Sequence, residues 1–217
     1  MIPSRPLLIT IDGPAGAGKT TVSKMLARKL GYRYLDTGAL YRGVAYEVRA
    51  AGIAADDDRA LGRVCSTLRL HLEKGRLISN GNDISDRIRS PEITMLASAV
   101  SARPVVRQAL LDLQRELGRD KRLVAEGRDM GTVVFPQADL KFFLDATVRQ
   151  RAIRRYEQYG QGGGQALERI EQEIRQRDAN DSNRDVAPLQ PAEDAMIIDS
   201  TTMDAQQVVD MMIKYVK

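Results

Sequence analysis

The sequence predicts an α/β fold built on a parallel sheet, and three observations predict it. Short apolar stretches typical of buried strands alternate with helical patterns along most of the 217 residues. A complete phosphate-binding loop pattern lies between the first such strand and the first helix. Residues 68–88 depart from the alternation and have the period of antiparallel strands. The length suits one core domain with insertions, or two small domains.

The first expected strand is Leu7–Ile11, and the P-loop pattern G-x-x-x-x-G-K-[ST] follows it. The pattern consists of Gly13, Pro14, Ala15, Gly16, Ala17, Gly18, Lys19 and Thr20. Its glycines let backbone N–H groups surround a phosphate, while Lys19 can reach the β- and γ-phosphates and the Thr20 hydroxyl can bind Mg²⁺. Apolar residues at helical spacing follow, up to Gly31. This order predicts that the chain binds a nucleoside triphosphate.

Four further strands are expected, and each of the five expected strands ends at or runs into an acidic residue. Asp12 follows the first strand, and the other four are Arg33–Leu35 before Asp36, Arg122–Ala125 before Glu126, Lys141–Leu144 before Asp145, and Ala195–Ile198 before Asp199. Ligands of such sheets bind beyond the carboxyl ends of the strands, so these acids are expected at the edge that carries the site. Most of them are expected to cap helices or to bind water.

Helical patterns fill the remaining segments. One has Leu40, Val44 and Val48 on one face and stops at Gly52. A second opens at Pro104 and ends at Gly118, and a third follows Asp204 near the C-terminus, with an apolar stripe that reaches Val216. Further helices are expected around 148–159 and 166–177, separated by the glycine-rich stretch 160–164, which is a surface loop or the tip of a lid.

The stretch 68–88 predicts a small antiparallel meander inserted into the α/β core. Leu68, Leu70 and Leu72 alternate with polar residues, and Asn80-Gly81 is a strong hairpin dipeptide. His71, the single histidine of the sequence, points away from the leucines and is expected to be solvated. Ser90 and the proline after it are expected to begin a helix.

Composition excludes several classes of protein. The net charge of +4 does not demand a nucleic-acid or membrane partner, and no apolar run approaches membrane-spanning length. The N-terminal apolar stretch is too short for a signal peptide. The single cysteine, Cys65, falls on an apolar helix face and is expected to pack inertly, which fits a reducing, cytoplasmic setting.

Several arginines lie after expected strands, in loops or together on one helix face, where they could bind phosphate groups. Arg128 and Asp129 follow an expected strand in a glycine-flanked loop. Arg151, Arg154 and Arg155 share a helix face by their spacing, either as part of a site or as a solvated face. Arg42 follows the acidic end of the second strand, while Arg177, Asp181 and Arg184 fall in a segment expected to be irregular.

Phosphoryl transfer explains such a set of cations. Its transition state spreads negative charge, and catalysis is mostly positioning plus fixed positive charge. An acceptor that is itself a phosphate is a dianion near neutral pH, because its second pKa is about 6. Its oxygen then needs no general base, and none is evident in the sequence. A closing lid that excludes water is expected, since water would otherwise be an acceptor.

With these features in place, the chain resembles the bacterial cytidylate kinases of the nucleoside monophosphate kinase group. The resemblance runs nearly end to end and rests on GPAGAGKT at 13–20, LDTGALYR at 35–42, EGRDMGTVVF at 126–135, RDANDSNRDVAPL at 177–189 and DSTT at 199–202. It implies a P-loop kinase with a five-stranded parallel sheet of order 2-3-1-4-5 and helices on both faces. The implied P-loop core is 1–36, 118–148 and 181–217, with a CMP-binding insertion at 37–117 and a lid at 149–180.

The resemblance also implies a role for individual residues. The ATP-binding residues are those of the P-loop together with Thr21. Arg42 and Arg128 would hold the CMP phosphate, and Ser98, Arg107 and Asp129 would read cytosine. Arg177 and Asp181 would contact the ribose, and Arg184 would reach phosphates near the transferring centre. Thr37 stands where the family usually has Ser. Arg151, Arg154 and Arg155 would belong to the lid, and Lys19, Arg128, Arg184 and Arg154 would be catalytic. Thr20 would bind Mg²⁺ directly and Glu126 through water, whereas for Asp145 we favour a helix-capping role.

The chemistry of cytosine supports this interpretation. A carboxylate such as Asp129 accepts from the N4 amino group, and an arginine such as Arg107 donates to N3 or O2. Uracil would place its O4 acceptor against the carboxylate. The sequence thus predicts phosphorylation of CMP and dCMP by ATP with Mg²⁺, by a cytoplasmic monomer with no nucleic-acid or membrane partner. The alternatives are a P-loop kinase for UMP, AMP or a metabolite hydroxyl, and a nucleotide-gated switch or nucleic-acid-binding module.

Overall fold

The computed structural model describes residue 3 and residues 5–73, 75–159 and 167–216. The chain forms two compact units, one of Met1–Leu35 with Asp120–Lys217 and one of Asp36–Arg119. The predicted insertion, 37–117, has its boundaries close to those of the second unit. Among the described residues, none of the helices combines the length and the apolar character needed to cross a membrane.

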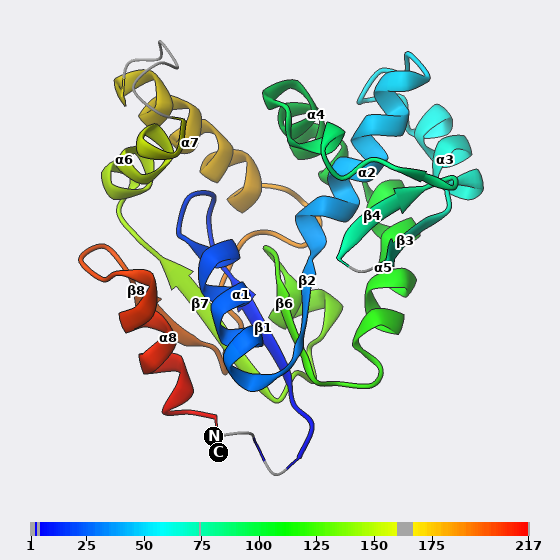
Figure 1. Cartoon of the computed structure of the whole chain (residues 1–217). Helices are drawn as coiled ribbons and strands as arrows, with labels where there is room; N and C mark the ends of the chain where they lie inside the picture. The colour runs from blue at the N-terminus through cyan, green and yellow to red at the C-terminus, as the bar shows by residue number, and fades with distance from the viewer. Residues whose placement is uncertain (1–2, 4, 74, 160–166, 217) are drawn as a thin grey trace. The chain divides into compact units, whose positions relative to one another are not determined.

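The first unit is built on a five-stranded sheet of order β2-β6-β1-β7-β8 (Figure 1). The strands are β1 (Leu8–Asp12), β2 (Arg33–Asp36), β6 (Leu123–Glu126), β7 (Leu140–Asp145) and β8 (Met196–Asp199). The pairs of β1 with β6, β1 with β7, and β7 with β8 are parallel. Counted along the chain within the sheet, this order is the predicted 2-3-1-4-5. The five expected strands are therefore confirmed, each within one residue of its predicted ends.

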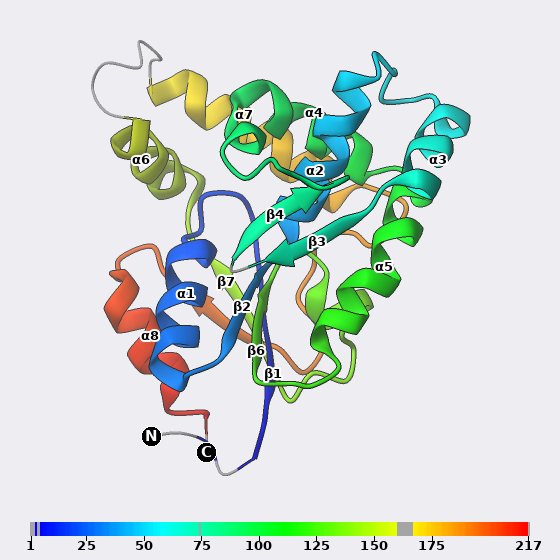
Figure 2. The ribbon, with the colours of Figure 1, turned by 45° about the vertical axis from the view of Figure 1, so that its right-hand side comes forward.

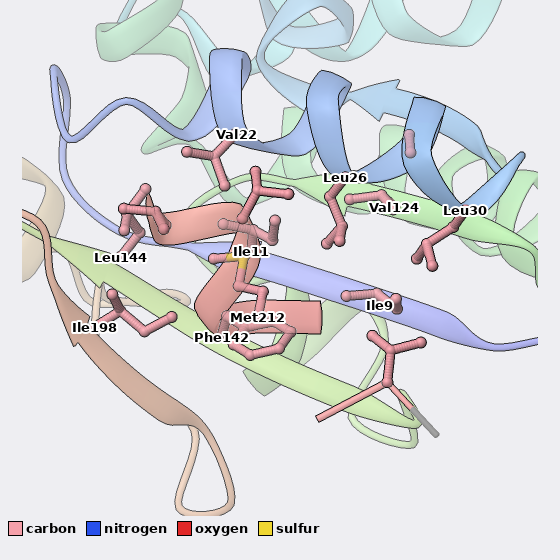
Figure 3. Close-up of a cluster of buried hydrophobic side chains, with 14 of the residues drawn as sticks. Ile9, Ile11, Val22, Leu26, Leu30, Val124, Phe142, Leu144, Ile198 and Met212 are labelled. Carbon is pink, nitrogen blue, oxygen red and sulfur yellow. The ribbon is translucent and has the colours of Figure 1, made fainter. Parts of the chain in front are cut away.

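Helices α1 (Lys19–Leu30) and α8 (Ala205–Ile213) pack on one face of this sheet. Figure 3 shows Ile9 and Ile11 of β1 in the buried cluster that these helices cover. Because side chains alternate along a strand, Thr10 and Asp12 point to the opposite face. There the single π-helical turn η2 (Met130–Val134) packs, and a Cβ on Gly131 would lie 3.2 Å from Thr10 Oγ1. The two faces of β1 thus have different partners: the apolar cluster covered by α1 and α8 on one face, and η2, whose backbone N–H groups bond to Asp12, on the other.

Two further helices follow β7, namely α6 (Val148–Tyr159) and α7 (Leu167–Ser182). They share a small core of Ala152, Ile170 and Ile174. The predicted irregular segment is wrong at its start, since Arg177 and Asp181 lie in α7, and only Arg184 lies beyond it. The helix runs five residues past Arg177, to Ser182, although most of these residues are polar. The predicted loop at 160–164 lies outside the described residues.

The helix-capping role predicted for Asp145 is also wrong. Thr147 caps α6, because its Oγ1 accepts a hydrogen bond from Gln150 N at 3.3 Å. The Asp145 carboxylate instead accepts from the adjacent Ala146 N at 2.8 Å. Two residues separate the strand from the helix, so Asp145 lies too early in the chain to reach the N–H groups of the first helical turn.

The second unit contains a three-stranded antiparallel sheet and four α-helices among its described residues. Its elements are α2 (Thr37–Ala50), α3 (Asp58–Thr67), β3 (Leu70–Glu73), β4 (Arg76–Ser79), β5 (Asn82–Asp83), the 3₁₀ turn η1 (Arg87–Arg89), α4 (Pro91–Ser101) and α5 (Pro104–Gly118). Figure 2 shows β3 and β4 side by side. The predicted meander is confirmed.

Local sequence explains the ends of these elements. Asn80 and Gly81 both have positive φ, 47° and 82°, which is what a tight hairpin turn requires. Ser90 Oγ accepts from Ile93 N and caps α4, as predicted. His71 is exposed on β3, and Cys65 is partly buried against the core of this unit, where burial raises the pKa of its thiol.

Candidate active site

The P-loop lies between β1 and α1 (Figure 1), and its backbone demands glycine. Gly13 has a φ of 143°, and a Cβ there would lie 2.0 Å from the carbonyl oxygen of Leu144. Gly18 has a φ of 95° and precedes the first residue of α1. Such conformations are open to glycine and strained for other residues. The loop therefore turns tightly onto the N-terminus of a helix, the arrangement that binds phosphate.

Lys19 is buried in this loop, and its ammonium group donates to the carbonyl oxygens of Gly13 and Pro14, both at 2.7 Å. Burial is the largest of the effects that lower the pKa of Lys19 to about 7, and the charge of Arg128 adds to it. The nearby carboxylates of Glu126 and Asp12 act in the opposite direction. Burial makes the charged form of Lys19 costly, and a phosphate anion bound beside it would stabilise that charge. Thr20 and Thr21 follow at the exposed start of α1.

Beside this lysine, arginines gather around Asp181. Arg128 Nε donates to Asp181 Oδ2 at 2.8 Å, and both side chains are largely buried. The pKa of Asp181 is lowered overall, because burial, which would raise it, is outweighed by the charges of Arg128, Arg177 and Arg184. The structure thus brings together residues that the sequence placed in two separate motifs, 126–135 and 177–189.

Arg184 and Asp129 form a second buried contact in this cluster. Arg184 Nη2 lies 3.9 Å from Asp129 Oδ1, and their side chains are 5% and 2% exposed. Arg184 Nε also donates to the carbonyl oxygen of Ala187. The predicted base reader and the predicted phosphate ligand are therefore neighbours in a strongly charged, water-poor environment.

Two arginines of α6 reach the P-loop backbone, so the solvated-face alternative does not hold for them. Arg151 donates to the carbonyl oxygens of Ala15 at 3.1 Å and Ala146 at 2.8 Å, and it pairs with Asp178 at 2.6 Å. Arg154 donates to the carbonyl oxygens of Ala17 at 3.4 Å and Ser200 at 2.5 Å, and of Met203 at 3.2 Å. A catalytic role for Arg154 requires it to exchange such bonds for phosphate oxygens. Arg155 lies on the same helix, half-buried.

Glu126 ends β6 and is buried, and Tyr34 of β2 donates its hydroxyl hydrogen bond to Glu126 Oε1. Sequence reasoning did not find Tyr34. It also treated Asp12 only as one acid among the strand ends, although Asp12 accepts from the backbone at Met130 and Gly131. The available signal was the alternation along β1, which turns Asp12 away from the apolar face.

Four predicted substrate residues lie in the second unit. Thr37 is buried at the start of α2, and Arg42 pairs with Asp36 at 2.8 Å. Asp36 also caps α2 by accepting from Ala39 N. On the other helices of this unit, Ser98 lies half-buried in α4 and Arg107 lies buried in α5. Arg107 donates to the carbonyl oxygen of Ser101 at 3.1 Å and stacks over the ring of Tyr41.

Comparison with known proteins gives consistent matches over almost the whole chain. The family model described as cytidylate kinase matches residues 9–217. The cytidylate kinase of Syntrophotalea carbinolica is 47% identical over 98% of this chain and 93% of that protein, and the cytidylate kinase of Thermotoga maritima is 44% identical over 96% of each.

Solved structures add a likeness of fold. A shikimate kinase from Acinetobacter baumannii has a TM-score of 0.50 at 19% identity, covering 97% of this chain and 93% of that chain. A shikimate kinase from Bacteroides thetaiotaomicron has a TM-score of 0.53 at 13% identity, covering 97% of this chain and 98% of that chain. At these identities the likeness shows the α/β kinase fold alone.

Proposed function

The chain belongs to the cytidylate kinase family, and we propose how its residues carry out the reaction of that family. The reaction moves the γ-phosphoryl group of ATP onto a phosphate oxygen of CMP or dCMP, with ADP as the leaving product. The observation that supports the assignment of residues is the group Arg128, Arg177 and Arg184 around Asp181. Two of these arginines, Arg128 and Arg177, add to burial in lowering the pKa of Lys19. A P-loop alone would fit many nucleotide-binding proteins.

The acceptor supplies its own nucleophile. A nucleoside monophosphate carries a dianionic phosphate at neutral pH, so its oxygen attacks without prior removal of a proton. The protein then has to hold two anions in line and to neutralise the charge that develops between them. We assign the hold on the donor to the P-loop amides, Thr21 and Lys19, and the hold on the acceptor phosphate to Arg42 and Arg128. Arg184 and Arg154 neutralise charge near the transferring group.

Selection of cytosine is assigned to Asp129 with Arg107 and Ser98. Asp129 accepts from the exocyclic amino group and Arg107 donates to the ring acceptors, and uracil reverses the first of these contacts. Arg177 and Asp181 are assigned to the ribose, and Thr37 offers a hydroxyl near the start of α2. Asp129 is buried, so an unmatched base oxygen facing it would carry a large penalty.

The residues at the P-loop also fit magnesium. Their donors are hard oxygens, a hydroxyl on Thr20 and a carboxylate on Glu126, which are ligands that Mg²⁺ prefers. Among the described residues no cluster of three or more His, Cys, Asp or Glu side chains could hold a metal ion. An ion that keeps its waters and binds chiefly through the phosphates fits this donor set. Magnesium would neutralise charge on the ATP phosphates, with Thr20 as direct ligand and Glu126 acting through water.

We further infer a cytoplasmic monomer whose partners are ATP and its small-molecule acceptors, with neither nucleic acid nor membrane among them. The near-balance of 33 basic against 29 acidic residues supports the absence of a nucleic-acid partner. Light scattering of the purified protein checks the monomer, because a dimer doubles the measured mass.

A coupled phosphotransfer assay with CMP, dCMP, UMP and AMP tests the function. CMP and dCMP are expected to be phosphorylated with ATP, and UMP and AMP with kcat/KM lower by about 10²-fold. A preference for UMP or AMP would contradict the assignment of Asp129 and Arg107. Absence of any diphosphate product from CMP would contradict the function itself.

A further inference from the structure

Asp12 holds a position that the catalytic assignments leave unexplained. It is the last residue of β1 and directly precedes the P-loop, and it is only 4% exposed. Its side chain points to the face of the sheet opposite the apolar cluster of Ile9 and Ile11 (Figure 3). An acid at the end of the first strand is thus buried on the side where the segment after β6 packs.

Both carboxylate oxygens of Asp12 are occupied by that segment. Oδ1 accepts from Met130 N at 2.9 Å, and Oδ2 accepts from Gly131 N at 2.7 Å. One residue earlier in β1, the carbonyl oxygen of Ile11 accepts from Gly127 N at 3.1 Å. The main chain is therefore fixed to β1 on both sides of Arg128 and Asp129.

The position calls for a carboxylate. Two adjacent N–H donors need two acceptors, and an asparagine offers one acceptor while its amide group would face the second donor. Burial, the main influence, raises the pKa of Asp12 to about 6, against the two backbone N–H bonds that favour the ionised form. Burying this charge is costly, and the two backbone N–H bonds that it accepts offset part of the cost.

We propose that Asp12 is a positioning residue for the acceptor nucleotide. Its carboxylate holds the turn that carries Arg128 and Asp129 against the strand from which the P-loop starts. Arg128, which holds the acceptor phosphate, and Asp129, which reads the base, then stay at fixed positions relative to the ATP phosphates bound by the P-loop. This inference rests on the roles proposed above for Arg128 and Asp129. Asp12 does not itself touch substrate in this account, because its two oxygens serve the backbone.

The same strand offers a matched control at its other end. Asp139 accepts from Leu8 N at 2.8 Å through Oδ2 and pairs with Lys121 at 2.9 Å, and its side chain is 8% exposed. It is also a buried carboxylate that holds a backbone N–H of β1 to a neighbouring segment. Asp139 lies at the amino end of β1, away from the P-loop. Its substitution therefore shows what is lost when a buried carboxylate no longer holds the backbone of β1, without a change next to the site.

The test compares Asp12→Asn and Asp139→Asn with the wild-type chain. In Asp12→Asn, KM for CMP is expected to rise about tenfold and the preference for CMP over UMP to fall about tenfold, because small displacements of positioning groups cost factors of this size or more. KM for ATP is expected to change by less than about threefold. Asp139→Asn is expected to lower thermal stability and to leave both KM values and the base preference in place.

A second variant keeps the inference testable if Asp12→Asn does not fold. A Cβ at Gly131 would lie 3.2 Å from Thr10 Oγ1 of β1 and 3.1 Å from Lys141 Cδ, both tight contacts. We therefore expect Gly131→Ala to push the turn away from β1 while the Asp12 carboxylate stays intact. The same selective loss for CMP is expected. Folded variants with an unchanged KM for CMP and an unchanged base preference overturn the proposal, as do equal losses for CMP and ATP. Because the wild-type assay is run alongside, failure of the proposed function would show in the wild type and failure of this inference only in the variants.

Discussion

The Arg128 guanidinium and the Asp181 carboxylate bond to each other at 2.8 Å, although each is assigned to a different part of CMP. In this arrangement the proposed phosphate ligand and the proposed ribose ligand hold one another in place. An arginine fixed by a carboxylate is preorganised, since less side-chain freedom is lost when phosphate binds. We therefore expect this part of the proposed acceptor site to be preorganised, with Arg177 and Arg184 adding positive charge around the same acid. The other proposed acceptor residues, Thr37, Arg42, Ser98 and Arg107, belong to the second unit.

Asp181→Asn is expected to weaken both the acceptor site and the fold. The amide keeps one acceptor for Arg128 but removes the negative charge, so the surrounding arginines repel one another more strongly. We expect KM for CMP to rise about tenfold and the free energy of unfolding to fall by about 1 to 3 kcal/mol. Steady-state kinetics and urea unfolding check both expected changes.

Glu173→Gln is the control on the same helix, because Glu173 pairs with Arg169 at the surface, and an exposed pair is worth about 0.5 kcal/mol or less. Similar effects from both variants would argue against preorganisation.

Lys19→Ala is expected to abolish turnover in a folded protein. The ammonium group of Lys19 lies in the P-loop, bonded to the carbonyl oxygens of Gly13 and Pro14. Alanine has no charge that could neutralise the γ-phosphate. We expect kcat to fall by about three orders of magnitude. Circular dichroism and thermal melting establish that the variant is folded, and Arg28→Ala, at an exposed position of the same helix, is the control. Near-normal turnover of Lys19→Ala would refute the mechanism.

Asp129→Asn is expected to change the choice of base. Asparagine has nearly the size of aspartate, and its amide can accept from the N4 group of cytosine or donate to O4 of uracil. The ratio of kcat/KM for CMP to that for UMP is expected to fall about 10- to 100-fold, chiefly through a gain for UMP. Competition assays with both nucleotides measure this ratio directly. An unchanged ratio would remove Asp129 from base recognition and leave it as the partner of Arg184.

The fold was largely predictable because its signals are local. Each expected strand is a short apolar run, and the P-loop identifies the first connection. The errors came where local patterns compete. Arg177 and Asp181 looked irregular because polar residues crowd the segment. In the structure α7 runs through them, and its last turns pair with distant arginines, Asp178 with Arg151 and Asp181 with Arg128. Asp145 looked like a cap because it ends a strand, but the two residues between β7 and α6 give the cap to Thr147.

The partners of site residues were far less predictable than the residues themselves. Arg151 and Arg154 were identified by helical spacing, but spacing does not reveal that their donors meet backbone carbonyls of the P-loop. The bond of Tyr34 to Glu126 joins residues 92 apart in the chain. Contacts of this kind depend on which strands become neighbours, and a single sequence contains that information only indirectly.

The buried carboxylate of Asp12 predicts an unusual dependence of stability on pH. Its pKa is raised from 3.8 to about 6, mainly by burial. A folded-state value above the unfolded one means that this group's contribution to stability is complete below about pH 3.8 and is lost as the pH rises through about 6. Between pH 7 and pH 5 the wild type should therefore gain about 1.3 kcal/mol relative to Asp12→Asn. Urea unfolding of both proteins at three pH values measures the difference. Titrating groups remote from Asp12 contribute equally to both proteins, whereas Lys19, whose pKa the Asp12 charge raises, adds a difference of its own. A difference that stays constant with pH would contradict the raised pKa.

Arg151 is expected to stabilise the P-loop through hydrogen bonds to the protein itself, with no contact to substrate. Its guanidinium joins Ala15 of the loop, Ala146 after β7 and Asp178 of α7, and the residue is 4% exposed. Arg151→Met keeps the apolar stem but leaves the Asp178 carboxylate, whose side chain is 20% exposed, without this arginine. We expect a cost of about 3 kcal/mol, at the low end of what breaking a buried ion pair costs. At about 2 to 4 °C per kcal/mol for a chain of this size, the melting temperature should fall by about 10 °C. Differential scanning calorimetry measures the shift in melting temperature, and KM for ATP should rise as the P-loop becomes less ordered.

Arg149→Met is the control on the same helix, because Arg149 is about half exposed and pairs with Glu171 at 3.2 Å, an interaction worth about 0 to 1 kcal/mol. A melting temperature of Arg151→Met within 2 °C or so of the Arg149→Met value would show that the P-loop keeps its conformation without this arginine.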